Sequence, residues 1–157
     1  MTFSHQEFLQ QAVNLAVQNV LEGGGPFAAL IVKNQQIIAA AGNQVTVNHD
    51  PTAHAEVMAI RAACSELQDF QLAGCTLYTS CEPCPMCLGA VYWARLSEVY
   101  FACNRFDAAS AGFDDSFIYQ QIPLSPEARQ IPMHYLPLAG ADRAFENWHA
   151  QSGKTLY

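Results

Sequence analysis

Two cysteines and one histidine have the types and spacing that suit a metal ion. Cys84 and Cys87 stand three residues apart, so on a helix they project from one face, and a helix amino terminus favours metal-binding thiolates. His54 is separated from them by an expected strand, but helices that follow neighbouring strands can begin at the same edge of a sheet. One nitrogen and two sulfur ligands suit zinc, and three protein ligands leave a fourth position for water. The set therefore predicts one catalytic Zn²⁺ per chain.

Glu56 stands two residues after the candidate histidine ligand. His54-x-Glu56 together with Pro83-Cys84-x-x-Cys87 reproduces the H-x-E and P-C-x-x-C signature of zinc deaminases. In that chemistry zinc lowers the pKa of its bound water towards about 7, and the glutamate moves protons between water, a ring nitrogen and the leaving amine. On a regular helix His54 and Glu56 would point about 200° apart. Both therefore reach one site only if the first helical turn faces it end-on.

Other interpretations of the cysteines stay open. A lone histidine near a helix start is usually a surface residue, and a lone CxxC pair can be redox-active or structural. Cys81, Cys84 and Cys87 resemble part of an iron–sulfur run, but no cysteine follows three residues later, as a ferredoxin-like pattern requires. A closed structural zinc site would need Cys81 or Cys103 as a fourth ligand and would leave Glu56 without a role. The remaining cysteines are expected to be small buried hydrophobes: Cys64, Cys75 and Cys103.

The elements that must position these residues follow from hydrophobic periodicity and turn residues. Helical spacing predicts a first helix over residues 5–21, and an Asp-Pro pair at 50–51 signals a second helix that runs to about residue 65. Further elements are expected in this order: strands at 27–32 and 37–41 that form a hairpin, a strand at 76–79, a helix at 83–95, a strand at 99–102 and a last helix at 141–150. The late alternation of strand and helix predicts parallel pairing within a mixed sheet that has helices on both faces. Three glycines at 23–25 are typical of a turn, although glycine also lets backbone approach a ligand closely.

The composition indicates one compact domain. The chain has 157 residues, of which 51% are hydrophobic and 13% charged, as suits a globular core. Its formal charge is −7 and its seven Lys and Arg residues are scattered singly, which argues against nucleic-acid binding and favours a small neutral substrate. We recognise neither a signal peptide nor an apolar run near the ~18 residues needed to cross a bilayer. We therefore expect a cytoplasmic protein whose six cysteines are thiols or metal ligands.

Three segments resemble bacterial guanine deaminases of the cytidine deaminase superfamily: residues 50–57 (DPTAHAEV), 79–90 (TSCEPCPMCLGA) and 111–119 (AGFDDSFIY). The resemblance covers most of residues 8–120 and is much weaker over 125–152. The first two segments also occur, with variations, in tRNA adenosine deaminases and cytosine deaminases, so they indicate the chemistry but not the substrate. The third segment and the terminal Tyr157 point to guanine.

The resemblance implies a fold, an assembly and a site. The expected fold is a three-layer α/β/α sandwich with a central mixed five-stranded sheet, in a single domain over residues 1–157 that forms a homodimer. Residues 140–157 would form a helix and tail that can be exchanged between subunits. Catalytic roles fall to Glu56 and Asp115, and zinc ligation falls to His54, Cys84 and Cys87. The residues expected around the purine are Asn43, Phe27, Trp93 and Tyr157.

These purine contacts also have structural interpretations. Phe27 and Trp93 could pack in the core, Asn43 after a glycine could be a turn residue, and Asp115 could be solvated beside Asp114. If Asp115 enters the site, guanine is favoured over cytosine, because guanine presents N–H donors that a carboxylate accepts whereas cytosine would present acceptors.

The predicted activity is zinc-dependent hydrolytic deamination of guanine to xanthine and ammonia. The alternatives on the same zinc core are a tRNA-specific adenosine deaminase and a cytosine deaminase. A third alternative is a zinc-stabilised interaction protein, in which metal removal would abolish folding while replacement of Glu56 would change little.

Overall fold

The computed structural model describes residues 2–157 and divides into two compact units. The first unit extends to Asp115, and the second comprises Ser116–Tyr157. The first unit contains α1 (His5–Leu21), β1 (Gly25–Lys33), β2 (Gln36–Asn43), α2 (Val45–Asn48), α3 (Ala55–Leu67), β3 (Thr76–Cys81), α4 (Pro85–Trp93), β4 (Glu98–Cys103) and α5 (Arg105–Ser110). The second unit contains α6 (Ser116–Gln121), the short 3-10 helix η1 (Pro126–Ala128) and α7 (Arg143–Ala150). Within residues 2–157, no helix is long and apolar enough to cross a membrane.

A mixed four-stranded sheet forms the centre of the first unit. Its strand order is β2-β1-β3-β4, with β1 antiparallel to both neighbours and β3 parallel to β4. The predicted hairpin and the late parallel pair are thus confirmed. The expectation of five strands is wrong, because residues 2–157 contain four. The chain after β4 continues into short helices and carries prolines at 123, 126, 132 and 137, which lack the N–H that a strand donates to its neighbour.

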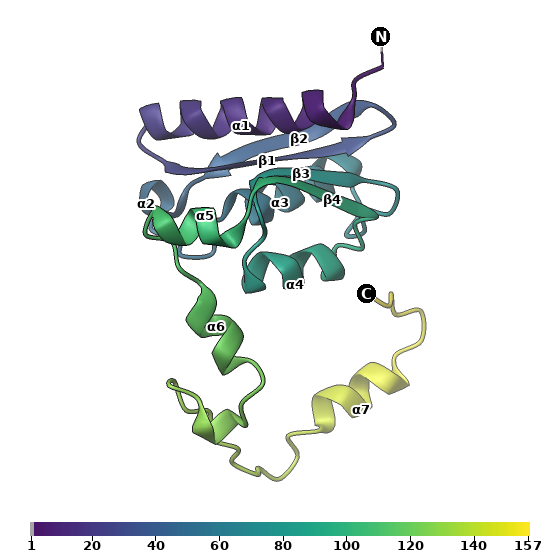
Figure 1. Cartoon of the computed structure of the whole chain (residues 1–157). Coiled ribbons are helices and arrows are strands. Elements are labelled where there is room, and N and C mark those ends of the chain that lie inside the picture. Colours follow the sequence, from purple (N-terminus) through teal and green to yellow (C-terminus); the bar gives the residue numbers. More distant parts are fainter. Residues whose placement is uncertain (1) are drawn as a thin grey trace. The chain divides into compact units, whose positions relative to one another are not determined.

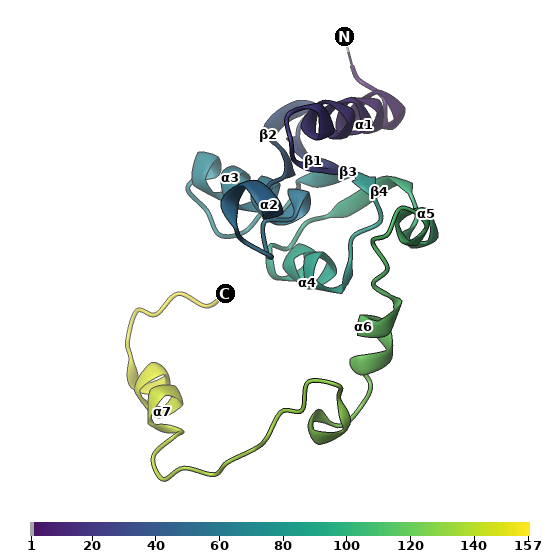
Figure 2. The ribbon, with the colours of Figure 1, turned by 90° about the vertical axis from the view of Figure 1, so that its left-hand side faces the viewer.

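Helices cover both faces of this sheet, as Figures 1 and 2 show. On one face α1 packs through Phe8 and Ala12 against Leu30 and Tyr78. On the other face α3 and α4 pack against the sheet, and the buried residues of that core are Ala29, Ile31, Ala39, Ala55, Ala59, Ala63, Leu72, Cys75, Leu77, Val91 and Ala94. Neighbouring residues of β1 enter different cores because successive side chains of a strand point to opposite faces. The first unit therefore has the predicted α/β/α layering.

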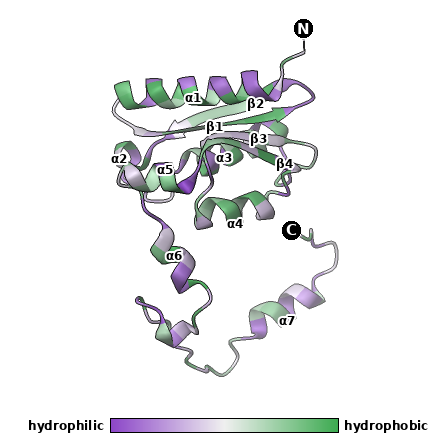
Figure 3. Ribbon diagram, in the orientation of Figure 1, coloured by the Kyte–Doolittle hydropathy of each residue, from purple (hydrophilic) through white to green (hydrophobic). Residues whose placement is uncertain are grey.

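The start of α1 has a capping box. Ser4 Oγ accepts a hydrogen bond from the Glu7 N–H at 3.2 Å, and Glu7 Oε2 accepts one from the Ser4 N–H at 2.7 Å. The rings of Phe3 and Phe8 lie 5.3 Å apart between centroids, which completes a hydrophobic staple. Apolar and polar residues alternate along α1 in Figure 3, since only one side of the helix packs on the sheet.

The second unit has no buried core. None of the residues Ser116–Tyr157 is classed as buried, and three of its apolar side chains, Ile131, Tyr135 and Leu136, are 81–83% exposed. The predicted last helix is present as α7. The ring of Trp148 in α7 makes an edge contact with the Tyr157 ring at 6.3 Å between centroids.

Candidate metal centre and active site

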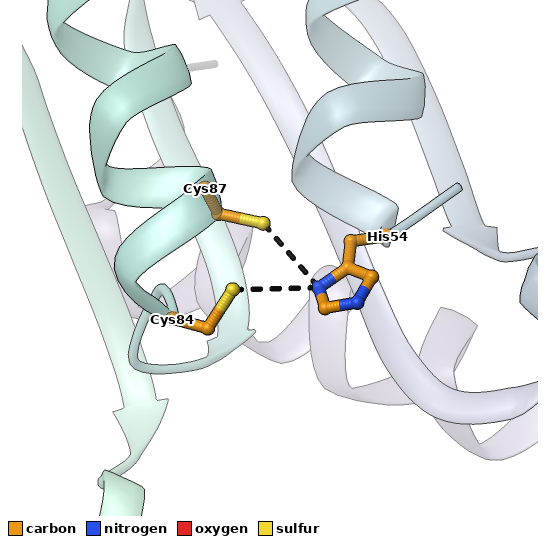
Figure 4. Close-up of side chains that lie close together, drawn as sticks. All are labelled: His54, Cys84 and Cys87. Atoms are coloured by element: carbon orange, nitrogen blue, oxygen red, sulfur yellow. Dashed lines mark hydrogen bonds between the residues drawn. The ribbon is translucent and has the colours of Figure 1, made fainter. Parts of the chain in front are cut away.

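The three predicted metal ligands converge in the first unit. Figure 4 shows His54 facing the sulfurs of Cys84 and Cys87, and its Nδ1 lies 3.5 Å from each Sγ. All three ligand atoms lie within 4.8 Å of one another. A tetrahedral Zn²⁺ that holds sulfur at about 2.3 Å and nitrogen at about 2.0 Å separates those atoms by about 3.5 Å. The donor set and its spacing therefore fit zinc.

Two helix starts bring these ligands together. His54 is the N-cap of α3 and Cys84 is the N-cap of α4, and both have extended backbones, with ψ of 151° and 170°. Pro85 occupies the start of α4, where its missing N–H costs nothing, and Cys87 follows in the first turn. The two amino termini thus converge on the site, and Cys87 is buried beneath it.

The start of α3 differs from the prediction. The signal at Asp50 and Pro51 marks a turn, in which Asp50 Oδ1 accepts hydrogen bonds from the Thr52 N–H at 2.8 Å and from its hydroxyl at 2.7 Å. The helix itself begins four residues later, at Ala55. His54 therefore precedes the helix. The separation of about 200° that a regular helix would impose between His54 and Glu56 does not apply.

The cysteine pair divides into a thiolate and a thiol. The pKa of Cys84 is lowered to about 4, because Cys87 and His54 donate hydrogen bonds to its sulfur. The neighbouring thiolate and burial raise the pKa of Cys87, and the same thiolate raises the pKa of His54. The site thus carries a negative sulfur that attracts a cation, and a bound divalent cation displaces the remaining thiol proton.

Glu56 lies beside the ligands and is almost completely buried, with 6% of its surface exposed. Its Oε1 is 3.1 Å from the Thr79 hydroxyl, and its Oε2 is 3.4 Å from Cys87 Sγ. Burial raises the pKa of Glu56, against the lowering effect of its hydrogen bonds. A carboxyl group whose pKa is raised towards neutrality is suited to accept and release protons.

Thr79 is a contact that the sequence analysis missed. It is fully buried in β3, and its hydroxyl also lies 3.1 Å from the Cys81 carbonyl oxygen. No signal in the sequence distinguishes it, because Thr76 and Ser80 of the same strand also carry hydroxyl groups.

Of the predicted purine contacts, Asp115 lies close enough to the metal ligands for the charge of Cys84 to affect it, and Asn43 and Phe27 stay predictions. Asp115 is half-buried, and both burial and the charge of Cys84 raise its pKa. Asn43 is buried at the end of β2, and the Phe27 ring meets Phe113 edge-on at 4.9 Å between centroids.

Two further predicted contacts, Trp93 and Tyr157, stay predictions. Trp93 is 71% exposed at the last turn of α4, whereas the ligands lie at the first turn, about 9 Å away along a helix axis. Tyr157 belongs to the second unit, where it contacts Trp148.

Comparison with known families settles the class of the site. Residues 2–103 match the family model for the cytidine and deoxycytidylate deaminase zinc-binding region. The chain belongs to this deaminase family. Zinc is the metal of these deaminases, and His54, Cys84 and Cys87 form the group in residues 2–157 that can hold it.

Relatives within the deaminase family differ in how much of the chain they match. Guanine deaminase from Bacillus subtilis is 53% identical over 155 residues, which cover 98% of this chain and 99% of that protein. An X-ray structure of guanine deaminase from Bacillus subtilis has a TM-score of 0.97 at 52% identity and covers 99% of both chains. A structure solved in complex with 2,6-diaminopurine has a TM-score of 0.70 at 32% identity, covering 73% of this chain and 65% of that one.

A tRNA-specific adenosine deaminase from Aquifex aeolicus matches a shorter part of the chain. It is 43% identical over 95 residues, which cover 60% of this chain and 63% of that protein. Similarity to the guanine deaminase therefore extends into the second unit, and similarity to the tRNA enzyme covers a smaller part of the chain.

Proposed function

We propose that this deaminase hydrolyses guanine to xanthine and ammonia with one bound zinc ion. The observation that carries the proposal is the buried Glu56 carboxyl, 3.4 Å from Cys87 Sγ within a His54, Cys84 and Cys87 set of zinc-like spacing. A structural zinc site has no use for a buried acid at that position, whereas hydrolytic deamination requires a proton carrier there. The choice of guanine is supported by a similarity to the guanine deaminase that spans both units.

Proton transfer through Glu56 accounts for the reaction. When bound, zinc lowers the pKa of a coordinated water so that it attacks at neutral pH. Glu56 takes a proton from the attacking water as its oxygen bonds to carbon 2 of guanine, and it delivers that proton to the adjacent ring nitrogen. The second proton of that water then passes from the new hydroxyl group on carbon 2 to the exocyclic amine, which leaves as ammonia as carbon 2 becomes a carbonyl. We assign assistance in this second transfer to Asp115, whose raised pKa suits a group that gives and takes protons.

Recognition of the purine is assigned to groups around this centre. The Asp115 carboxylate accepts hydrogen bonds from the ring N–H and the exocyclic amine of guanine, while cytosine would turn acceptors towards it. The bound 2,6-diaminopurine of a relative is likewise a purine with an amine at carbon 2. The further contacts proposed for the base are Asn43, Phe27, Trp93 and Tyr157.

We also propose a homodimer with an exchanged tail. The second unit buries none of its residues and exposes large apolar side chains such as Tyr135, Leu136 and Tyr157. Such a segment gains stability by packing against another surface, and a partner subunit supplies one. In this proposal residues 140–157 cover the partner's purine site and exclude water from it, so that residues 1–157 act as one functional domain per site.

The proposed location is the cytoplasm. All six cysteines are unpaired thiols in the structure, and the metal site requires reduced sulfur. A reducing compartment keeps such thiols available for the metal.

Product analysis tests the proposed reaction directly. Purified zinc-loaded protein should convert guanine into equimolar xanthine and ammonia. Chromatography measures the bases, and an enzyme-coupled assay measures the ammonia. If guanine is recovered unchanged while zinc is present at one ion per chain, the proposed activity is wrong.

A further inference from the structure

Asn19 occupies a space between α1 and the β1–β2 hairpin that only glycines leave open. Its side chain points from α1 towards the sheet and is 5% exposed. A Cβ atom at Gly42 or at Gly24 would collide with the Asn19 amide. Besides allowing the α1–β1 turn, Gly24 makes room, together with Gly42, for the buried Asn19 amide.

The Asn19 side chain uses both ends of its amide. Its Nδ2 donates hydrogen bonds to the Gly25 carbonyl oxygen at 2.7 Å and to the Asn43 carbonyl oxygen at 2.9 Å. Its Oδ1 accepts one from Gln44 Nε2 at 3.1 Å. A single buried residue therefore ties the start of β1 to the end of β2.

Asn43 is held by hydrogen bonds at both its backbone carbonyl and its side chain. Its carbonyl is bound by Asn19, and its side-chain Oδ1 accepts a hydrogen bond from the Val45 N–H at 3.2 Å. A Cβ at Gly25 would lie 2.8 Å from that same Oδ1, so the Asn43 side chain also fits against a glycine. With its oxygen held by Val45, the Asn43 amide has its Nδ2 hydrogens left to donate to a ligand.

The hydrogen bonds of Asn19 also connect, through Gln44, to the segment that carries the histidine ligand. Gln44 binds Asn19 through its side chain, and its backbone N–H donates to the Ala53 carbonyl oxygen at 2.9 Å. His54 follows Ala53 directly. Asn19 itself belongs to α1, on the face of the sheet opposite α3 and α4, as Figure 2 shows.

We propose that Asn19 is a positioning residue, which sets the orientation of Asn43 in the purine site from the far face of the sheet. The proposal rests on the proposed function, in which Asn43 contacts the purine. Asn19 touches neither the base nor the metal ligands. It acts by fixing the backbone at the end of β2, so its loss misplaces Asn43 without removing it.

Steady-state kinetics of Asn19→Ala test the role. We expect kcat/KM for guanine to fall on the order of 10- to 100-fold, mainly through KM, because misplacement of a binding group weakens substrate contact. Zinc content should stay at one ion per chain. Asn14→Ala is the matched control, since Asn14 is an exposed asparagine on the same helix, and its kcat/KM should stay within about twofold of the parent.

A double-mutant cycle separates positioning from a general structural effect. If Asn19 acts through Asn43, then Asn19→Ala combined with Asn43→Ala should be no worse than Asn43→Ala alone, within about threefold. Losses that multiply would overturn the proposal, and so would an unchanged KM in Asn19→Ala.

Refilling the cavity keeps the test valid if Asn19→Ala is too unstable to assay. Adding Gly42→Ala to it places a methyl group where the Asn19 amide stood, since the near neighbours of that methyl are Asn19 atoms. This double variant should regain thermal stability but keep the raised KM. Recovery of both would show that Asn19 only fills space.

Amide hydrogen exchange separates this inference from the proposed function. In Asn19→Ala the amides of Gln44 and Val45 should exchange at least tenfold faster in the absence of substrate, while in Asn14→Ala they should not change. If these amides keep their protection, the proposed tie is wrong, even if guanine is the substrate. If they lose it while the parent protein does not act on guanine, the tie stands and the proposed activity fails.

Discussion

Glu56 shares its buried position with a thiol and a hydroxyl. The Thr79 hydroxyl lies 3.1 Å from its Oε1 and the Cys87 sulfur lies 3.4 Å from its Oε2. Burial is the largest effect on its pKa and raises it, which makes the carboxylate a better proton acceptor near neutral pH. This environment supports the proposed role of Glu56 in proton transfer.

Replacement of Glu56 by Gln should separate metal binding from turnover. The amide has nearly the same shape but cannot accept the proton of the attacking water, so kcat should fall by at least ~10²–10⁴-fold. Zinc content should stay at one ion per chain, since Glu56 is not a proposed ligand. Activity within a few-fold of the parent would remove Glu56 from the mechanism.

Cys84→Ser should lose metal and activity together. Cys84 is one of the three proposed zinc ligands, and hydrogen bonds from Cys87 and His54 lower its pKa to about 4. A serine hydroxyl stays protonated at neutral pH and binds zinc poorly. Metal analysis after dialysis should give far less than one zinc per chain. Cys103→Ser is the control, because Cys103 is exposed, contrary to the expectation that it is buried, and its replacement should leave the zinc content unchanged.

At the residue level the sequence predicted which side chains meet at the metal site. The types and spacing of His54, Cys84 and Cys87 were sufficient, because few arrangements of one nitrogen and two sulfurs serve another purpose. Thr79 and Asn19 could not be predicted. Their roles depend on contacts across the sheet or between layers, which a linear pattern does not contain.

At the level of elements, a residue with an extended backbone precedes each of the two helices at the metal site, α3 and α4. His54 and Cys84 are N-caps, so each backbone turns just before its helix begins. The sequence predicted the helices but not where α3 begins, because an aspartate followed by proline is also typical of a turn. Local hydrogen bonds from Thr52 to Asp50 stabilise that turn, so the helix begins only at Ala55.

The capping box of α1 predicts a pH-dependent contribution to stability. The Ser4 N–H and hydroxyl hold the pKa of Glu7 below its ordinary value of 4.5. A lowered folded-state pKa means that the contribution is present above the ordinary value and is lost as the pH falls through the folded value. Glu7→Ala should therefore destabilise the protein at pH 7, and the difference from the parent should shrink as the pH falls below the ordinary value of 4.5.

Urea unfolding of parent and Glu7→Ala across that pH range measures this effect. A difference in unfolding free energy that stays constant from pH 7 to pH 3 would show that the Glu7 carboxylate does not stabilise α1.

At the level of the whole molecule, the first unit followed from the sequence more completely than the second. Its strands are apolar and its longer helices periodic, so these elements and their order could be predicted, including the parallel β3–β4 pair, whereas the short helices α2 and α5 were not predicted. The fifth strand came from the resemblance, and the structure has short helices and proline-containing segments after β4 instead. The path of the second unit had no periodic pattern to predict it.

The tail proposal predicts activity from two inactive chains. Deletion of residues 153–157 should abolish activity but leave zinc bound, since the proposed ligands lie in the first unit. A heterodimer of this truncated chain with full-length Glu56→Ala should regain one working site, because the intact tail covers the intact centre of its partner. Co-expression with two tags and xanthine measurement on the isolated heterodimer provide the test. A fully inactive heterodimer beside an active parent dimer would contradict exchange.

The central claim is that this deaminase acts on free guanine, and comparison of kcat/KM values tests it most directly. Zinc-loaded protein would be assayed by ammonia release with guanine, adenine, cytosine and a tRNA anticodon stem-loop at low and moderate salt. The account predicts the highest kcat/KM for guanine, with little salt dependence, because the chain has a formal charge of −7 and no cluster of cations. The highest value for adenosine in the RNA, falling steeply with salt, would contradict it and identify a tRNA-editing enzyme.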